Sequence, residues 1–316
     1  MLNITNGDSV IASFREGQIP GRYLPWRDAL HDGAVPRASS LEALSDVRAR
    51  RISGPGSAEY ARVRAEFAER DRVLGSFRDH DETVLWFEHD LYDQLQLVQI
   101  LDWLSRQDRE GTRISLIQIG RHPEVRPFYG LGQLSGRQLS DLLPQRLPVT
   151  TEQFEIGQKV WQAFCAPDPQ PLVLLAAESF QGMPFLAAAL QRCLEEYPSI
   201  HDGLSRTERQ LLSAGASGAR HRSDYYLVSS AHEACPWGDQ SVYLRLEGLA
   251  DGPRPALERL GPDEFALTDR GRQILAGRDD WLRDARGDIW IGGVHFNGDG
   301  PQWRWDAARM TLVSRA

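Results

Sequence analysis

The sequence predicts an α/β protein: a Rossmann-like, doubly wound and mostly parallel sheet, followed by a smaller winged-helix-like α+β domain. Apolar runs without polar alternation are typical of strands buried on both faces of a sheet. Amphipathic segments at helical spacing separate these runs, which indicates helices that cover the sheet. Later in the chain, three helical segments precede a strand–turn–strand pattern and a closing helix. We place the boundary after Gly203, which gives domains 1–203 and 204–316.

The first domain alternates strands with helices along the chain. Strands are predicted at 2–5, 22–26, 83–87, 113–119 and 171–177. Helices are predicted at 10–17, 40–76, 91–104, 136–143, 150–166 and 183–196. In the second domain we expect helices from 205, at 223–234 and at 239–249, a hairpin within 256–268 and a helix at 269–277. Aromatic-rich segments at 288–294 and 302–306 predict a terminal pair of strands.

The composition is that of a folded globular protein. The chain has 316 residues, of which 41% are hydrophobic and 25% charged, and this excludes a largely disordered chain. No apolar run approaches the length of about 18 residues typical of a membrane-spanning helix, and the first residues lack a signal-peptide pattern. We therefore expect a cytoplasmic protein. Three widely spaced cysteines predict neither a disulfide framework nor a zinc ribbon.

The charge of the chain is acidic, with a net value of −8. Residues 1–203 hold 21 basic and 28 acidic residues, and residues 204–316 hold 15 and 16. Proteins that bind nucleic acid without sequence preference usually carry a basic domain, because they neutralise phosphates. Neither domain is basic, so nucleic acid is a disfavoured partner, although a local arginine patch stays open as an alternative.

Polar side chains follow the predicted strands of the first domain. In an open α/β sheet, ligands bind beyond the carboxyl ends of the strands, so these turns are the candidate site. The turns are Asn6-Gly7-Asp8-Ser9, Glu88-His89-Asp90, Gly120-Arg121-His122 and Glu178-Ser179. Together they would line one edge with carboxylates, imidazoles, an arginine and serines.

The turn of Asn6, Gly7, Asp8 and Ser9 joins a strand to a helix and could bind an anion through its backbone N–H groups. The Asp8 carboxylate would repel a phosphate unless a metal ion lay between them. The alternative is that Asp8 or Ser9 caps the helix, and for Ser9 we favour capping. The turn contains neither a G-x-G-x-x-G fingerprint nor a P-loop, so it is no standard nucleotide motif.

The densest polar cluster is Glu88, His89 and Asp90, with Asp93 and Gln94 one helical turn later. Carboxylates and an imidazole can act as acid, base or metal ligand. Successive residues point in different directions, so at most two of the first three face one ligand. The alternative is that Asp90 caps the helix and His89 packs against its neighbours.

Trp26, Arg27 and Asp28 follow the second predicted strand and are further candidates for substrate binding. Arg27 or Arg121 could bind an acidic group through two hydrogen bonds. An ordinary surface ion pair is the alternative for either arginine.

Two functions from different classes fit these observations. The first is an enzyme or ligand-binding protein for a nucleotide or another phosphorylated small molecule. Asp8 with Glu88 or Asp90 would hold a divalent metal ion or act as acid and base, and His89 would carry a proton. The second is a regulator, in which the first domain senses a small molecule and the second binds DNA or protein. The expected recognition helix, 239–249, has a single arginine, Arg245, which is unfavourable for DNA.

Long strings of the sequence resemble a bacterial family called domain of unknown function 1835. They are LNITNGDS, GRYLPWRDALHDGAVP and VLWFEHDLYDQLQLVQILDWL. The terminal string DIWIGGVHFNGDGPQWRWD resembles its companion, domain of unknown function 3658. The resemblance spans most of the chain and implies no reaction. It implies that the family signature includes the following candidate residues: Asn6, Gly7, Asp8, Ser9, Trp26, Asp28, Glu88, His89, Asp90, Asp93, Gln94, His295, Trp303, Arg304 and Asp306.

Overall fold

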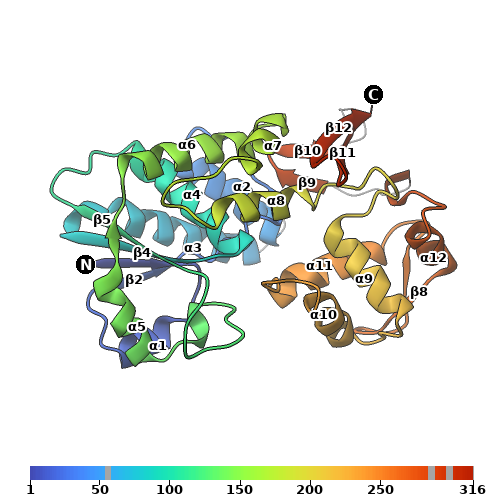
Figure 1. Ribbon diagram of the computed structural model, residues 1–316, viewed down its shortest axis with the longest axis horizontal. Coiled ribbons are helices and arrows are strands. Elements are labelled where there is room, and N and C mark those ends of the chain that lie inside the picture. Colours follow the sequence, from blue (N-terminus) through green and yellow to red (C-terminus); the bar gives the residue numbers. More distant parts are fainter. Residues whose placement is uncertain (54–57, 284–288, 297–301, 316) are drawn as a thin grey trace. The chain divides into compact units, whose positions relative to one another are not determined.

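A computed structural model of the chain describes residues 1–53, 58–283, 289–296 and 302–315, and it divides into two compact units (Figure 1). The first unit is Met1–Leu190 together with Gly292–Val294, and the second is Gln191–Ile291 with His295–Ala316. The first unit thus ends before the expected boundary after Gly203, and the chain returns to it near its end. No helix of the described ranges combines the length and the apolar character needed to cross a bilayer.

The first unit is an α/β structure built on a five-stranded sheet of order β2-β1-β4-β5-β6. The strands are β1 (Leu2–Thr5), β2 (Arg22–Pro25), β4 (Glu82–Glu88), β5 (Arg113–Ile119) and β6 (Leu147–Pro148). All pairs are parallel except β5 with β6. The strand order reverses at β1, because the chain adds β2 on one side of it and β4 on the other. The carboxyl ends of β1 and β4 therefore lie next to each other.

Helices flank this sheet, with α1 and α5 on one face and α4 and α6 on the other (Figure 1). The helices are α1 (Ile11–Glu16), α2 (Leu41–Ser53), α3 (Ala58–Gly75), α4 (Leu91–Ser105), α5 (Gly136–Leu142), α6 (Thr151–Phe164), α7 (Gln170–Ala176) and α8 (Leu186–Leu194). The short strand β3 (Gly33–Ala34) belongs to a separate sheet with β9 (Ile289–Gly292) and β10 (Val294–Phe296). Four of the five predicted strands are confirmed.

The fifth predicted strand, 171–177, is wrong, because this segment forms the helix α7. Leu172, Val173 and Leu175 are buried and Leu174 is 70% exposed, which is the pattern of a helix with one buried face. A short apolar run fits a buried helix as well as a buried strand, so periodicity alone does not separate them. Glu178 and Ser179 consequently do not follow a strand of the sheet, and the Glu178 carboxylate pairs with Lys159.

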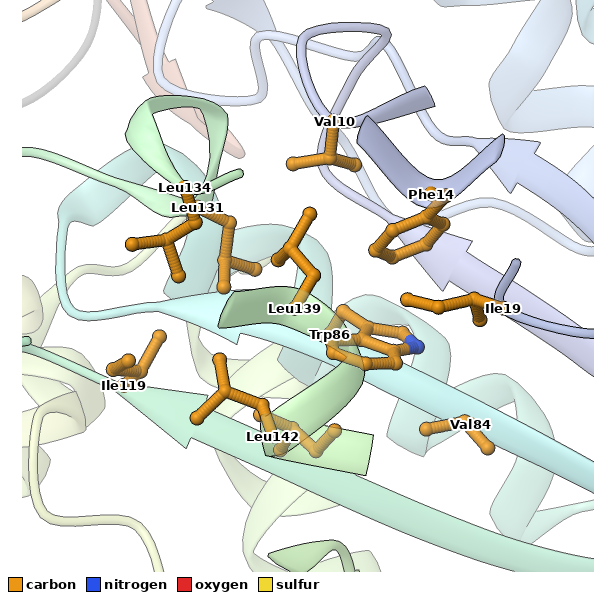
Figure 2. Close-up of a cluster of buried hydrophobic side chains, with 11 residues drawn as sticks. Val10, Phe14, Ile19, Val84, Trp86, Ile119, Leu131, Leu134, Leu139 and Leu142 are labelled. Carbon is orange, nitrogen blue, oxygen red and sulfur yellow. The ribbon is translucent and has the colours of Figure 1, made fainter. Parts of the chain in front are cut away.

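The core between the sheet and the helices α1 and α5 surrounds Trp86 (Figure 2). The fully buried Trp86 ring lies 4.8 Å from the Phe14 ring, centre to centre, and its Nε1 donates to Asn3 Oδ1 at 3.0 Å. Gly17 and Gly136 allow α1 and α5 to touch, since a Cβ on Gly17 would collide with the Gly136 carbonyl. This packing fixes the loop that leads into α5, which also covers the end of β4.

The second unit has the expected order of three helices, a hairpin and a closing helix. These are α9 (Arg206–Ala216), α10 (Arg222–Ser230), α11 (Asp239–Leu249), β7 (Leu257–Arg259), β8 (Phe265–Leu267) and α12 (Asp269–Leu275). The terminal hairpin joins β11 (Gln302–Asp306) to β12 (Thr311–Arg315). The expected pairing of 302–306 with 288–294 is therefore wrong: the predictions missed the strand 311–315, which is the partner. Residue 288 lies outside the described residues.

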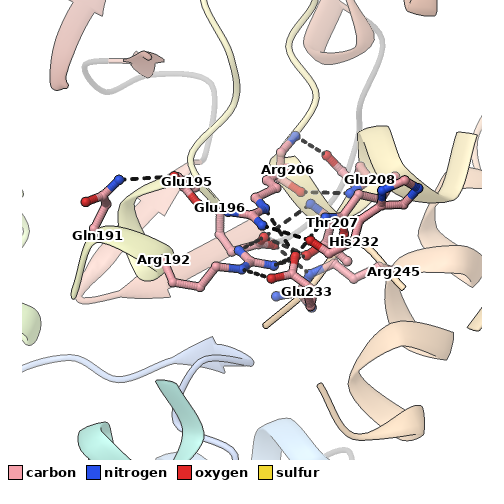
Figure 3. Close-up of polar contacts among 12 residues, drawn as sticks. Gln191, Arg192, Glu195, Glu196, Arg206, Thr207, Glu208, His232, Glu233 and Arg245 are labelled. Atoms are coloured by element: carbon pink, nitrogen blue, oxygen red, sulfur yellow. Dashed lines mark hydrogen bonds and ion pairs between the residues drawn. The ribbon is translucent and has the colours of Figure 1, made fainter. Parts of the chain in front are cut away.

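Buried charges hold the helices of the second unit together (Figure 3). The Glu196 carboxylate accepts hydrogen bonds from Arg192 Nη1 and Thr207 Oγ1, both at 2.6 Å, and Arg245 Nε lies 3.4 Å away. Burial alone would raise the pKa of Glu196, but the arginine charges and the hydrogen bonds lower it to about 2. Glu196 is therefore ionised in the folded protein and links α8, α9 and α11.

Removing the buried Leu139 side chain tests the packing of α5 on the sheet. We expect Leu139→Ala to lower the free energy of unfolding by roughly 2–5 kcal/mol, because it leaves a cavity in the core. The matched change at the exposed Leu174 should cost less than about 0.5 kcal/mol. Urea unfolding measures both, and equal costs would show that Leu139 is not part of a packed core.

The charge network predicts a pH dependence of stability. The folded-state pKa of Glu196 lies below its ordinary 4.5, so its stabilising contribution is present above that pH and is lost as the pH falls toward 2. The stability advantage of the unaltered chain over Glu196→Gln should shrink by on the order of 3 kcal/mol over this window. Urea unfolding at about pH 6 and about pH 3 should show roughly 2 kcal/mol of this change, because pH 3 lies about 1.5 units below the unfolded pKa and still above the folded one. An advantage that grows at the lower pH would contradict this assignment.

Candidate active site

The turns that follow β1 and β4 meet at the edge where the strand order reverses. The parallel register pairs Leu2 with Thr83 and Thr5 with Trp86, so the two strands end side by side. The Asn6 side chain, just after β1, donates from Nδ2 to Asp93 Oδ2 at 2.7 Å. The predicted proximity of these two turns is thereby confirmed, and a direct hydrogen bond joins them.

Three carboxyl groups converge at this edge, and we call them the acidic cluster: Glu88, Asp90 and Asp93. Each offers an oxygen that lies within 4.8 Å of those of the other two. Asp90 begins α4 and accepts from the Asp93 backbone N–H at 2.8 Å, as the capping alternative predicts. Asp93 Oδ1 accepts in turn from the Glu88 backbone N–H at 2.7 Å. The cluster is thus held by backbone groups of β4 and α4.

Burial makes ionisation of the acidic cluster costly. Burial, reinforced by the charge of Asp90, raises the pKa of Glu88 to about 8. Burial also raises the pKa of Asp93, and the charges of Glu88 and Asp90 add to the effect. Across the part of the chain that the structure describes, no arginine, lysine or histidine forms an ion pair with Glu88 or Asp93. The site therefore favours either a bound proton or a bound cation.

The loop after β5 covers Glu88. Glu88 Oε1 accepts a hydrogen bond from the Leu131 backbone N–H at 2.5 Å, and Leu131 lies 43 residues after Glu88 in the chain. At the neighbouring Gly130, a Cβ would collide with the Glu88 carboxylate, so a larger residue there would displace this carboxylate. The sequence analysis did not single out Gly130 or Leu131. The glycine was the one local feature that could have indicated a close approach of this loop to another group.

His89 lies beside the acidic cluster but is not a member of it. Its ring lies 5.9 Å from the Phe185 ring and 6.2 Å from the Phe128 ring, centre to centre. Its Nδ1 is buried without a hydrogen-bond partner among the described residues. Gln94 is fully buried and donates from Nε2 to the Glu88 carbonyl at 2.6 Å. Of the predicted residues after β4, the acids thus converge and His89 packs against aromatic rings.

Asp8 and Arg27 form an exposed pair at the ends of β1 and β2. Arg27 Nε and Nη2 donate to the two Asp8 oxygens at 2.5 Å each, which lowers the pKa of Asp8. Arg27 adopts the left-handed backbone region, with a φ of 60°, which is uncommon for a residue other than glycine. Asp8 is thus engaged by Arg27 and lies outside the acidic cluster, on the rim of the edge.

The capping role favoured for Ser9 is wrong. The helix α1 begins at Ile11 with Val10 as its N-cap, and no side chain caps it. The exposed Ser9 side chain packs toward Gly132, where an added Cβ would come within 2.8 Å of Ser9 Oγ. Gly7 is half-buried below the Tyr92 hydroxyl. The turn therefore faces the loop after β5 rather than its own helix.

Trp26 and Asp28 are buried and hold the fold. Asp28 Oδ1 accepts from Arg48 Nε at 2.9 Å and forms an ion pair with Arg48 Nη2 at 2.8 Å, and Arg70 Nη1 lies 3.7 Å from Oδ2. The Arg70 guanidinium lies 4.1 Å from the centre of the Trp26 ring. These contacts place both side chains away from the rim, although their positions after β2 suggested substrate binding.

Arg121 is exposed at the end of β5. It lines a cleft of about 700 Å³ together with His122 and residues of β5 and β6. The strands β2 and β5 flank β1 and β4, so Arg27 and Arg121 lie on opposite sides of the acidic cluster. Three strand spacings, about 14 Å, separate their backbones.

No model of a known protein family matches the chain. No curated protein matches it either. The function therefore has to be argued from the site itself.

Asp8 is exposed and Asp28 is buried, so replacing each aspartate by asparagine should have a different effect on stability. Asp28→Asn should cost on the order of 3–5 kcal/mol, because it leaves two buried arginines without their carboxylate. Asp8→Asn should cost less than about 1 kcal/mol, because its ion pair is exposed. Urea unfolding of both variants checks this contrast, which equal costs would refute.

Proposed function

We propose that the first unit is a Rossmann-like domain that binds a divalent cation at the acidic cluster and an anionic small molecule beside it. The observation that carries the proposal is the convergence of Glu88, Asp90 and Asp93 within 4.8 Å where the strand order reverses. Ligands of open α/β sheets bind at such a reversal, beyond the carboxyl ends of the strands.

The donor set fits a hard divalent cation such as Mg²⁺. Such ions take oxygen ligands, and carboxylates are the ligands they prefer. Two buried carboxyl groups without a cationic partner among the described side chains are costly to ionise, and a cation would remove that cost. When bound, the ion would neutralise part of the charge of a phosphate or carboxylate ligand. Asn6 would keep Asp93 oriented through its hydrogen bond.

The rim of the site supplies groups for an anionic ligand. Arg121 is exposed on one side of the acidic cluster. Arg27 is exposed on the other side and would exchange its ion pair with Asp8 for a ligand anion, so a nucleotide or another extended phosphorylated molecule fits better than a single small anion. In the absence of the cation, Glu88 is the residue best suited to hold a proton, because it is buried beside the other acids, and a bound cation would displace that proton. In this proposal His89 is not a ligand of the cation.

For the second unit we propose a winged-helix-like fold, which its order of helices and hairpin supports. The alternative function, a regulator that binds DNA through this unit, has less support. Arg245, the one basic residue of α11, pairs with Glu196 and lies 5.3 Å from the centre of the Trp237 ring. It is therefore engaged within its own unit, which disfavours phosphate binding by this helix.

Thermal unfolding with Mg²⁺ tests the cation site. A ligand at one hundred times its dissociation constant adds about 2.7 kcal/mol of stability, so the midpoint should rise by several degrees. Glu88→Gln and Asp90→Asn should abolish the rise, because each removes one charge while keeping the size of the side chain. Asparagine also keeps the cap of α4.

Asp141→Asn, an exposed change on α5, is the matched control and should keep the full response to Mg²⁺. Inorganic phosphate added with Mg²⁺ should raise the midpoint further in the unaltered chain. No response to Mg²⁺, or an undiminished response in Glu88→Gln, would overturn the proposal. A response to duplex DNA alone would favour the regulator.

A further inference from the structure

A second cavity lies along the far half of α4, away from the acidic cluster. It has a volume of about 570 Å³, is open on one side and is lined by residues 36–41 and Leu44, the end of α4 and the end of α6. Its size is within the range of sites for small molecules. Asp93 and Asp102 are nine residues apart on one helix, which corresponds to roughly 14 Å along its axis. The cavity is therefore a separate place in the first unit, and its ligand is independent of the proposed function.

The helix α4 presents one polar stripe to this cavity. Gln99, Asp102, Trp103 and Arg106 line it and follow the spacing of a single helix face. Gln99 is 2% exposed, and its Oε1 accepts from Trp26 Nε1 at 2.8 Å. Its Nε2 is buried and has no acceptor among the described residues, and the side chain has to turn this atom toward the cavity before a ligand can reach it. A buried donor left without an acceptor costs about 1–3 kcal/mol, so a ligand acceptor at this position would be stabilising.

Asp102 supplies the complementary acceptor. Its carboxyl group is 5% exposed, and Oδ1 accepts from Arg106 Nη2 at 2.6 Å. A carboxylate has about four acceptor sites, so this bond leaves capacity for a ligand N–H. The stripe therefore offers a donor and an acceptor one helical turn apart.

Aromatic side chains form part of the cavity wall. Trp103 comes from α4 and Trp161 from α6, and both line the cavity. Indole rings provide large flat apolar surfaces on which a planar ring can stack. Cys165 also lines the cavity, but burial raises the pKa of its thiol, so it is suited to packing rather than to nucleophilic chemistry.

We propose that this cavity binds a nucleobase or a similar planar heterocycle that presents an N–H donor beside an acceptor. The N–H would donate to Asp102, the acceptor would receive Gln99 Nε2, and the ring would lie against the tryptophans. A sugar without a base has the polar groups but not the planar ring, so it should not bind.

Calorimetric titration of the full chain with adenosine and with guanosine tests the proposal. At least one of them should bind in the millimolar range or more tightly, and ribose should not. Asp102→Asn should weaken binding by about tenfold or more, because the amide presents a donor where the ligand also has one. Gln99→Glu keeps the acceptor for Trp26 and removes the donor, so it should weaken binding similarly.

Two controls separate this cavity from the other site and from misfolding. Asp141→Asn should bind the nucleoside as the unaltered chain does. Glu88→Gln should do so too, even if it loses its response to Mg²⁺, because the acidic cluster is a different place. Circular dichroism shows whether each variant is folded. Failure of both nucleosides to bind, or full binding by a folded Asp102→Asn and a folded Gln99→Glu, would overturn the proposal.

Discussion

The parallel pairing of β1 with β4 is the constraint on which the rest of the first unit depends. It brings together two turns that are far apart in the chain and lets Asn6 hydrogen bond to Asp93, 87 residues later. It also sets the register in which Trp86 reaches Asn3 and fills the core below the site. Any other strand order would separate these turns and leave the carboxylates of β4 without their neighbour.

The buried acids of this unit are of two kinds: one is compensated by arginines, and the others have no such partner among the described residues. Asp28 is buried with Arg48 and Arg70, so its charge is compensated, and removing that charge should lower the stability of the fold. Glu88 and Asp93 are buried beside another acid and have no such compensation among the described residues. An uncompensated cluster lowers the stability of the empty fold, and a site that binds a charged ligand can offset that cost. The contrast separates a structural aspartate from candidate functional acids.

The sequence predicts much of the architecture and part of the site. Four strands, most helices and the convergence of the acids after β4 follow from apolar runs and from the rule that ligands bind at strand ends. The role of 171–177 could not be predicted, because a short apolar run suits a helix or a strand. The burial of Trp26 and Asp28 could not be predicted either, because it depends on arginines contributed by the later helices α2 and α3. Leu131 reaches Glu88 through a loop whose path local patterns do not describe.

The return of the chain to the first unit at Gly292–Val294 bears on how the protein is made. The Gly292 carbonyl accepts from the Val35 backbone N–H at 2.8 Å, and the Gly293 N–H donates to the Phe164 carbonyl at 2.9 Å. Both glycines pack where a Cβ would collide with carbonyls at the end of α6. Domains usually fold from the amino terminus while the chain is still being synthesised. Here the ribosome must deliver the chain through Val294, and with it most of the second unit, before the first unit has these backbone partners, so maturation of the first unit waits for translation of the second.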